Sequence, residues 1–384
     1  MADKIRSEVL VIGAGPAGIC AAYWLAKRAI PYRVVDQAAV VGSTWAHLYP
    51  SLQLNTLSLN SHLPGALIPL RYGFFPLGRQ YYDYLTRYVR ARQFNITLNV
   101  TVTRVSPEGD GWRVESSEGV DQYPAVIVAA GRFNNPYFPS IPGADTFRGQ
   151  VIHASAFHDP QDYAGQRVMV VGNGPSGGDI AAALATYAAR PVLLAVRSDV
   201  VLARKYPFGL PHAVWAYAIH ALPKPLRKPL TNALVYQGYP GMKSLPIRFA
   251  PNRDDRQGTS APIRGRELYD ALKQGGVVGV AGLAALRERC AVLNDGSEHP
   301  VDVVILSTGY RPALGFLDVP FATDGEGWPL RAVDPVYGAE GMQIAGYRGL
   351  YLVGRFYRGR GALRNFRYEA KIAAHQIERD FRLH

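Results

Sequence analysis

Two stretches of the sequence decide its fold: VLVIGAGPAGICAAYWLAK at residues 9–27 and VMVVGNGPSGGDIAAALA at residues 168–185. Each combines the apolar run of a buried strand, a G-x-G-x-x-G spacing and an alanine-rich helix pattern. The glycines are Gly13, Gly15 and Gly18 in the first stretch and Gly172, Gly174 and Gly177 in the second. Here glycine permits a tight turn and close backbone approach, and the helix N-terminus offers free N–H groups to a pyrophosphate. Packing alone does not explain two such motifs in the same register, so we expect two bound dinucleotides.

The residue that follows the next strand differs between the two stretches. Strand 32–35 is followed by Asp36, whose carboxylate accepts hydrogen bonds from a ribose 2′-OH and repels a 2′-phosphate. Strand 192–196 is followed by Arg197 and Ser198, and a guanidinium beside a hydroxyl suits a 2′-phosphate. The first site is therefore predicted to bind FAD and the second NADPH, with Arg204 and Lys205 as helpers. The alternative for Arg197 is an ordinary solvated arginine.

The remaining patterns predict an α/β fold with two dinucleotide-binding (Rossmann-like) domains, the NADPH domain inserted into the FAD domain. We expect helices at 79–94 and 365–380, and strands at 96–105, 111–116, 123–129, 301–306 and 350–354. The FAD-binding domain is predicted to comprise residues 1–149 and 310–384, and the NADPH-binding domain residues 150–309. Glycine-containing crossings at residues 130–131 and 308–309 would connect them.

Composition restricts the classes of protein that the chain can belong to. Its 384 residues are 48% hydrophobic and 19% charged, which is typical of a globular protein with room for two cores. Its two cysteines, Cys20 and Cys290, exclude a disulfide framework, a cysteine zinc site and a C-x-x-C redox pair, and no metal site is predicted. The net charge of +12 comes from scattered arginines, so we expect no nucleic-acid partner.

Targeting and membrane signals are weak in this sequence. The first expected strand begins too early for a signal peptide to precede it, so we expect the cytoplasm. The stretch 206–223 has no acidic residue, lysine or arginine, but it contains Pro207 and Pro211 and does not suit a membrane-spanning helix. We favour a lid over a substrate cavity for this stretch and keep an interfacial helix as the alternative, while the role of residues 206–240 stays open. We expect no membrane association, and a homo-oligomer is compatible with the sequence.

The stretch FRGQVIHASAF at residues 147–157 matches the pattern F-x-G-x-x-x-H-x-x-x-(F/Y/W) just before the second glycine motif. On this stretch, and on GSTW at 42–45 and LSTGY at 306–310, the chain resembles the class B flavin-dependent monooxygenases. This group comprises the flavin-containing monooxygenases, Baeyer–Villiger enzymes and plant YUCCA enzymes. Ser43 departs from the usual glycine, and Phe157-His158-Asp159 departs from the Baeyer–Villiger version of the signature. Gly354-Arg355 stands where disulfide reductases carry Gly-Asp, which argues against a thiol reductase.

The resemblance implies a set of site residues. Asn55 occupies the position of an active-site asparagine, and a non-titrating amide there can donate a hydrogen bond beside the flavin. Its alternatives are a turn-forming role, or replacement in that role by Asn60. Trp45 is expected to pack on the flavin or, alternatively, in the core, and His153 to serve structure rather than proton transfer. The residues expected to hold FAD are Gly13, Gly15, Pro16, Ala17, Gly18, Asp36, Gln37, Ser43, Thr44, Trp45, Leu54, Asn55, Val102, Ala130 and Gly131. Those expected to hold NADPH or to lie at the second crossing are Gly172, Asn173, Gly174, Pro175, Ser176, Gly177, Arg197, Ser198, Arg204, Lys205, Thr308, Gly309 and Tyr310.

The activity implied by the resemblance is an NADPH- and dioxygen-dependent monooxygenation of a small organic substrate through a flavin 4a-(hydro)peroxide. We favour N- or S-oxygenation at this point. The alternatives are oxidative decarboxylation of a 2-oxo acid, Baeyer–Villiger oxidation, an NADPH-dependent flavin reductase or oxidase without organic oxygenation, and a non-catalytic nucleotide-binding regulator.

Overall fold

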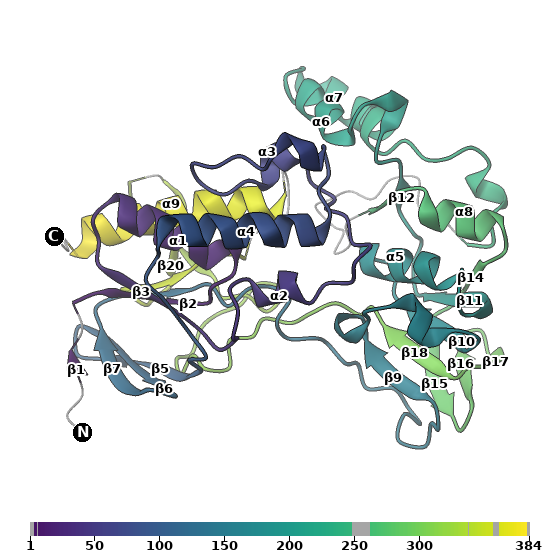
Figure 1. Ribbon diagram of the computed structural model, residues 1–384, viewed down its shortest axis with the longest axis horizontal. Coiled ribbons are helices and arrows are strands. Elements are labelled where there is room, and N and C mark those ends of the chain that lie inside the picture. The colour runs from purple at the N-terminus through teal and green to yellow at the C-terminus, as the bar shows by residue number, and fades with distance from the viewer. Residues whose placement is uncertain (1–3, 6, 248–261, 337, 356–360, 382–384) are drawn as a thin grey trace. The chain divides into compact units, whose positions relative to one another are not determined.

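The chain folds into two compact units (Figure 1). The computed structural model describes residues 4–5, 7–247, 262–336, 338–355 and 361–381. Unit 1 comprises Met1–Leu48, Thr56–Asn135 and Tyr310–His384, and unit 2 comprises Tyr49–Asn55 and Pro136–Gly309. The short segment Tyr49–Asn55 thus belongs to unit 2, although the residues on either side of it belong to unit 1.

Unit 1 is built on a seven-stranded sheet whose central strands are parallel. In spatial order the strands are β19 (Arg331–Asp334), β20 (Ala339–Ile344), β21 (Leu350–Leu352), β8 (Val126–Val128), β2 (Val9–Ile12), β3 (Tyr32–Asp36) and β4 (Ile96–Leu98). A smaller sheet contains β1 (Lys4–Ile5), β7 (Gly119–Tyr123), β6 (Gly111–Ser116) and β5 (Val102–Glu108). The helices are α1 (Pro16–Lys27), α2 (Ser43–Ala46), α3 (Ser58–Ser61), α4 (Gly78–Arg92) and α9 (Ala362–Phe381). α1 packs against both the sheet and α9, so its alanine-rich sequence is buried on two sides.

Unit 2 repeats this plan on a five-stranded parallel sheet. In spatial order its strands are β14 (Val277–Ala281), β11 (Ala189–Val196), β10 (Arg167–Val171), β18 (Val303–Leu306) and β9 (Gln150–His153). Smaller sheets contain β15 (Leu283–Arg287), β16 (Cys290–Leu293) and β17 (Glu298–Pro300), and β12 (Leu202–Ala203) with β13 (Ile263–Arg264). The helices are α5 (Pro175–Leu184), α6 (His212–His220), α7 (Lys224–Leu230) and α8 (Glu267–Lys273). α5 and α8 cover one face of the main sheet and β15 and β16 the other (Figure 1), which gives the unit two cores.

Each glycine motif lies where the strand order of its sheet reverses. In unit 1 the chain runs from β2 outward to β3 on one side and returns to β8 on the other. In unit 2 it runs from β10 to β11 and returns to β18. In open parallel sheets this reversal point, at the carboxyl ends of the strands, is where ligands bind. The predicted crossing residues follow β8 and β18, so the topology brings each crossing beside a glycine motif.

The α/β fold class is confirmed, and so are the strands and helices around both motifs. The helices predicted at 79–94 and 365–380 are α4 and α9. The single strand predicted at 96–105 is wrong, because residues 96–98 and 102–108 belong to different sheets. The chain turns between them at Asn99, whose φ of 59° is compatible with asparagine but not with a continuous strand.

Candidate functional site

The three glycines of the first motif have different surroundings. A Cβ on Gly13, which has a φ of 111°, would meet the carbonyl oxygen of Ala129 at the end of β8. A Cβ on Gly18 would meet the carbonyl of Gly13, so these two glycines allow strand, turn and helix to approach closely. Gly15, by contrast, has an unstrained φ of −78°, and a Cβ there would meet no atom within 4 Å. The space beside Gly15 at the N-terminus of α1 therefore fits a pyrophosphate.

The second motif reproduces this arrangement in unit 2. A Cβ on Gly172, with a φ of 134°, would meet the carbonyl of Ser307 at the end of β18. A Cβ on Gly177 would meet the carbonyl of Gly172. Gly174 has a φ of −87° and open space around its added Cβ. Pro175 and Pro16 both occupy the first helical turn, where their missing N–H is tolerated. Both units thus offer an equivalent anion cradle.

Asp36 is tied to the backbone of the first cradle. One carboxylate oxygen accepts a hydrogen bond from the backbone N–H of Ala14 at 2.7 Å, and the other accepts one from Ala38 at 2.8 Å. A carboxylate offers about four acceptor positions, so capacity for a ribose hydroxyl remains. The half-buried side chain is therefore fixed at the mouth of the cradle, while the neighbouring Gln37 is exposed.

The GSTW stretch is also attached to the first cradle. The backbone N–H of Gly42 donates to the carbonyl of Ala14 at 3.0 Å, and Ser43, Thr44 and Trp45 follow in α2. Trp45 is half-buried, and its ring centroid lies 4.4 Å from that of Tyr81 on α4. Both interpretations of Trp45 stay open, because this contact leaves part of the ring accessible.

The other residues predicted for FAD lie on neighbouring elements of unit 1. Ala130 and Gly131 follow β8 directly, and both are half-buried. Val102 begins β5 in the smaller sheet and packs against the unit 1 core. Tyr310, predicted at the second crossing, contacts the Phe133 ring at a centroid distance of 5.2 Å.

Arg197 is exposed at the carboxyl end of β11. Its side chain passes close to Gly282, where an added Cβ would lie 2.7 Å from the Arg197 Cγ. The neighbouring Ser198 hydroxyl accepts a hydrogen bond from the Asn173 amide of the cradle at 2.8 Å. Pro175 and Ser176 complete the cradle, with Ser176 exposed. The strand end and the cradle are thus held together, and an exposed guanidinium lies next to them.

Arg204 and Lys205 do not share the exposed position of Arg197. Arg204 donates to the carbonyl of Gly238 at 3.1 Å, and its guanidinium lies 5.3 Å from the centroid of the Tyr239 ring. Lys205 is 8% exposed and donates to the side-chain oxygen of Gln53 at 2.7 Å. Their expected role as phosphate helpers therefore gains no support from their surroundings.

The FRGQVIHASAF signature is an internal clamp of unit 2. Phe147 and Phe157 are buried in the two cores, and a Cβ on Gly149 would meet the Phe147 ring. His153 is 2% exposed; its Nε2 pairs with the carbonyl of Gly309 at 3.0 Å and its Nδ1 with the Ser155 hydroxyl at 2.9 Å. Burial lowers the pKa of His153 below its usual value. A neutral imidazole held between two partners serves structure, as expected from the sequence.

The signature also contacts the predicted second crossing at residues 308–309. Gly309, which has a φ of 83°, provides the carbonyl that pairs with His153. Thr308 donates from its hydroxyl to the carbonyl of Tyr137. The chain therefore leaves unit 2 from a position that the signature holds.

Asn55 ends the segment Tyr49–Asn55 of unit 2. The preceding Leu54 is 5% exposed, whereas Asn55 is half-buried. Its sequence competitor, Asn60, lies in α3 of unit 1 with 7% exposure, and its carbonyl accepts from Arg367 at 3.3 Å. The buried Asn60 has a structural position, so Asn55 is the better candidate for a side chain that meets a ligand.

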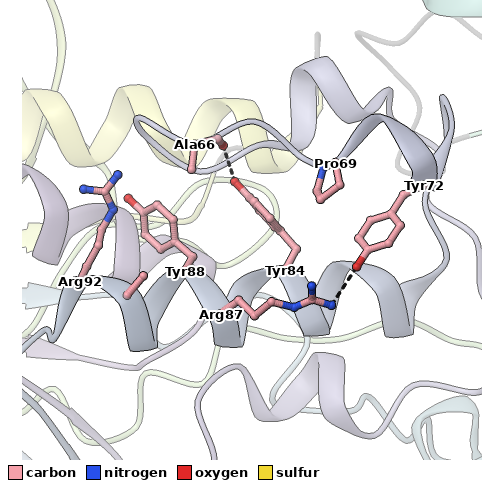
Figure 2. A pocket seen from close by; sticks show the side chains of 8 residues that line it. Ala66, Pro69, Tyr72, Tyr84, Arg87, Tyr88 and Arg92 are labelled. Atoms are coloured by element: carbon pink, nitrogen blue, oxygen red, sulfur yellow. Dashed lines mark hydrogen bonds between the residues drawn. The ribbon is translucent and has the colours of Figure 1, made fainter.

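A groove of about 430 Å³ lies between α4 and the segment that precedes it (Figure 2). Tyr84 donates to the carbonyl of Ala66 at 2.5 Å, and Arg87 donates to the Tyr72 hydroxyl at 3.0 Å. The Arg92 guanidinium lies 4.6 Å from the centroid of the Tyr88 ring. None of the lining residues belongs to the predicted cofactor or catalytic set, and these contacts stabilise α4.

Fold and cradles together define a flavoprotein class with two dinucleotide-binding domains, and comparison with known proteins agrees. Residues 10–207 match the family described as pyridine nucleotide-disulphide oxidoreductase. The chain is 30% identical over 370 residues to indole-3-pyruvate monooxygenase YUCCA1 of Oryza sativa subsp. japonica, with 91% of this chain and 87% of the rice protein covered. The chain therefore belongs to the pyridine nucleotide-disulphide oxidoreductase family. Within that family it belongs to the class B flavin-dependent monooxygenases. It is an FAD- and NADPH-dependent monooxygenase, so the predicted enzyme class and cofactors are confirmed.

Solved structures show the same fold at lower identity. A flavin-containing monooxygenase from Stenotrophomonas maltophilia has a TM-score of 0.74 at 24% identity, with 97% of this chain and 98% of that chain covered. A bacillithiol disulfide reductase from Bacillus cereus has a TM-score of 0.69 at 20% identity, with 97% and 99% covered. The fold alone therefore does not separate oxygenation from reduction.

Within the described ranges, no helix has the length and apolar character needed to cross a membrane. Sequence reasoning missed two contacts of segment 49–55 with unit 2: Tyr49 with Asp179 of α5, and Gln53 with Lys205. The G-x-G-x-x-G pattern placed Asp179 in the first turns of α5, but no local signal indicated that segment 49–55 would reach it.

Proposed function

We propose that the cradle of unit 1 binds FAD, that the cradle of unit 2 binds NADPH, and that Asn55 faces the reacting part of the bound flavin. The observation that carries the assignment is the difference between two otherwise equivalent cradles. Asp36 places a negative charge at the first, where a 2′-phosphate would be repelled. Arg197 places an exposed positive charge at the second, where a 2′-phosphate would be attracted.

In this proposal the chain performs binding, orientation and protection, while reduced FAD supplies the electrons that activate dioxygen. The N–H groups at the start of α1 and α5 hold the two pyrophosphates, and Asp36 orients the ribose of the first nucleotide. Asn55 contributes a donor that keeps its protonation state over the working pH range. Such a fixed dipole stabilises charge beside the flavin without adding a proton of its own.

For the substrate we propose a small 2-oxo acid, which loses its carboxyl group as carbon dioxide. The sequence alone favours N- or S-oxygenation, but a relative at 30% identity bears the name indole-3-pyruvate monooxygenase, and indole-3-pyruvate is a 2-oxo acid. The balanced reaction consumes one 2-oxo acid, one dioxygen, one NADPH and one proton. It yields the acid shortened by one carbon, carbon dioxide, water and NADP⁺. The net charge of +12 is compatible with an anionic substrate.

The test is aerobic NADPH oxidation by the purified flavin-loaded protein, with product analysis by mass spectrometry. Indole-3-pyruvate should stimulate NADPH consumption and yield indole-3-acetate and carbon dioxide in equal amounts. Formation of a sulfoxide or N-oxide from an added sulfide or amine, with the 2-oxo acid left intact, would return the assignment to heteroatom oxygenation. NADPH consumption that yields only hydrogen peroxide with all three substrate classes would indicate an oxidase.

A further inference from the structure

The segment Tyr49–Asn55 is anchored in unit 2 by its apolar side chains. Tyr49 is 8% exposed and belongs to the core beneath α5, where its ring centroid lies 5.9 Å from that of Phe157. Leu52 packs against the same core. The segment that carries Asn55 therefore rests on the core of the unit with the second cradle.

Two polar contacts made by the buried side chains of Tyr49 and Lys205 fix the same segment. The Tyr49 hydroxyl donates to the Asp179 carboxylate at 3.4 Å, and Lys205 Nζ donates to the Gln53 side-chain oxygen at 2.7 Å. Asp179 lies on α5, which begins at the second cradle, and Lys205 follows β12. Both contacts involve a charged group, and the Lys205–Gln53 contact is the stronger because it is the shorter.

Lys205 and Asp179 also influence one another. Burial lowers the pKa of Lys205 to about 8, against the attraction of Asp179 and Glu267. Burial raises the pKa of Asp179 to about 6, although the Lys205 charge pulls it down. Arg264 and His212 are the other ionisable groups near Lys205, and burial lowers the pKa of His212 to about 3. At neutral pH the pair is thus a buried ammonium and a half-buried carboxylate, with His212 uncharged.

Buried charges of this kind contribute little to stability compared with apolar residues of the same size. Their contribution is instead to positioning. An ammonium group that is removed from water needs a hydrogen-bond acceptor in the protein, so it holds that acceptor in place. The acceptor here is Gln53, two residues before Asn55. The donor is therefore suited to fixing the segment, whereas the apolar contacts of Tyr49 and Leu52 only hold it on the core.

We propose that Lys205 and Asp179 are positioning residues that hold segment Tyr49–Asn55 on the second unit and thereby fix the Asn55 side chain. Lys205 acts on Gln53, and Asp179 acts on Tyr49 and on the Lys205 charge. This inference rests on the proposed role of Asn55. It also gives Lys205 a role other than recognition of the 2′-phosphate, which we assign to Arg197 in the proposed function.

The test compares Lys205→Met with Lys273→Met, because Lys273 is an exposed lysine of α8 in the same unit. Methionine keeps the length and apolar body of lysine but removes the donor and the charge, and Asp179 can become neutral, so the fold should survive. Hydrogen–deuterium exchange of the flavin-loaded protein without NADPH reports on the segment independently of turnover. Amides of residues 51–55 should exchange about tenfold faster in Lys205→Met and at the parent rate in Lys273→Met.

Gln53 tests the same contact from the other side. Gln53→Leu should reproduce the faster exchange, whereas Gln53→Glu keeps an acceptor for Lys205 and should retain slow exchange. In turnover, Lys205→Met and Gln53→Leu should release several-fold more hydrogen peroxide per NADPH, with the preference for NADPH over NADH unchanged.

Parent-like exchange in both Lys205→Met and Gln53→Leu would overturn the proposal. A weaker preference for NADPH over NADH in Lys205→Met would also overturn it, because Lys205 would then recognise the phosphate. Faster exchange without more peroxide release would support the positioning role and instead contradict the role proposed for Asn55.

Discussion

The two cradles share their backbone geometry and differ in the chemistry placed around it. Gly15 and Gly174 face open space in the same unstrained conformation, and each helix begins with a proline. The strand that follows ends in a carboxylate in unit 1 and in an exposed guanidinium in unit 2. The shared backbone geometry suits a pyrophosphate in both units, and in our proposal one side chain at a strand end distinguishes the two nucleotides.

A second difference lies inside the helices. Counted from Pro16 and Pro175, Cys20 of α1 and Asp179 of α5 occupy the same position. Burial raises the pKa of Cys20 to about 12, which leaves an inert thiol in the core. Asp179 instead contacts the segment that carries Asn55. The first helix therefore serves packing, and the second also organises a neighbouring segment.

The largest expected effect comes from filling the open space of one cradle at a time. Gly15→Leu places a side chain where the first pyrophosphate would lie, so the protein should fold but carry almost no flavin. The backbone there is unstrained, and a poorer N-cap costs only about 1 kcal/mol, so folding should survive. Absorbance of the purified protein measures flavin content, and circular dichroism checks the fold.

Gly174→Leu is the matched control for that experiment. It should retain flavin at the parent level and bind NADPH poorly. Full flavin content in Gly15→Leu would contradict the assignment of FAD to the first cradle. Flavin loss in Gly174→Leu alone would reverse the assignment of the two cradles.

Asn55→Ala should uncouple NADPH oxidation from oxygenation. Loss of one donor in a site that excludes water corresponds to about 2–4 kcal/mol by analogy with oxyanion-stabilising groups. Flavin reduction by NADPH should stay near the parent rate, while most reducing equivalents appear as hydrogen peroxide. A peroxide assay beside product quantification measures this, with Asn60→Ala as the comparison. Parent-like coupling in Asn55→Ala would make Asn55 a loop residue.

Arg197→Ala should weaken NADPH specifically. A lost charge-assisted phosphate contact of about 2 kcal/mol corresponds to roughly 30-fold in the Michaelis constant. The constant for NADH should hardly change, and Arg266→Ala, which alters another exposed arginine of unit 2, should affect neither. Gly282→Ala should produce a smaller loss, because its Cβ would displace the Arg197 side chain. Equal weakening of both nucleotides in Arg197→Ala would assign Arg197 a structural role.

The smallest expected effect is a pH dependence of stability due to Asp179. Its pKa rises on folding from 3.8 to about 6, so the folded state binds the proton more tightly and loses stability as the pH rises through this window. Asp179→Asn should flatten the stability profile between about pH 4 and 6 by on the order of 1 kcal/mol. Chemical denaturation at several pH values measures this, and an unchanged slope would show that Asp179 is solvated.

The local features of this fold are predictable from the sequence, and the long-range ones are not. The glycine spacing and apolar runs locate both cradles, because the turn, the strand and the helix N-terminus all depend on residues close in sequence. The segment Tyr49–Asn55 joins unit 2 through Asp179 and Lys205, which lie far away along the chain. No periodicity records such a contact, so Lys205 resembles a phosphate-binding cation until its buried surroundings are known.

The most direct test of the account gives the second cradle the charge of the first. Arg197→Asp should leave flavin content unchanged and invert the nucleotide preference. The measurement is anaerobic titration of the flavin-loaded protein with NADPH and with NADH, followed by bleaching of the flavin absorbance. We expect tighter NADPH binding in the parent and tighter NADH binding in the variant. A variant that still prefers NADPH, or that loses its flavin, would contradict the assignment of the two nucleotides to the two cradles.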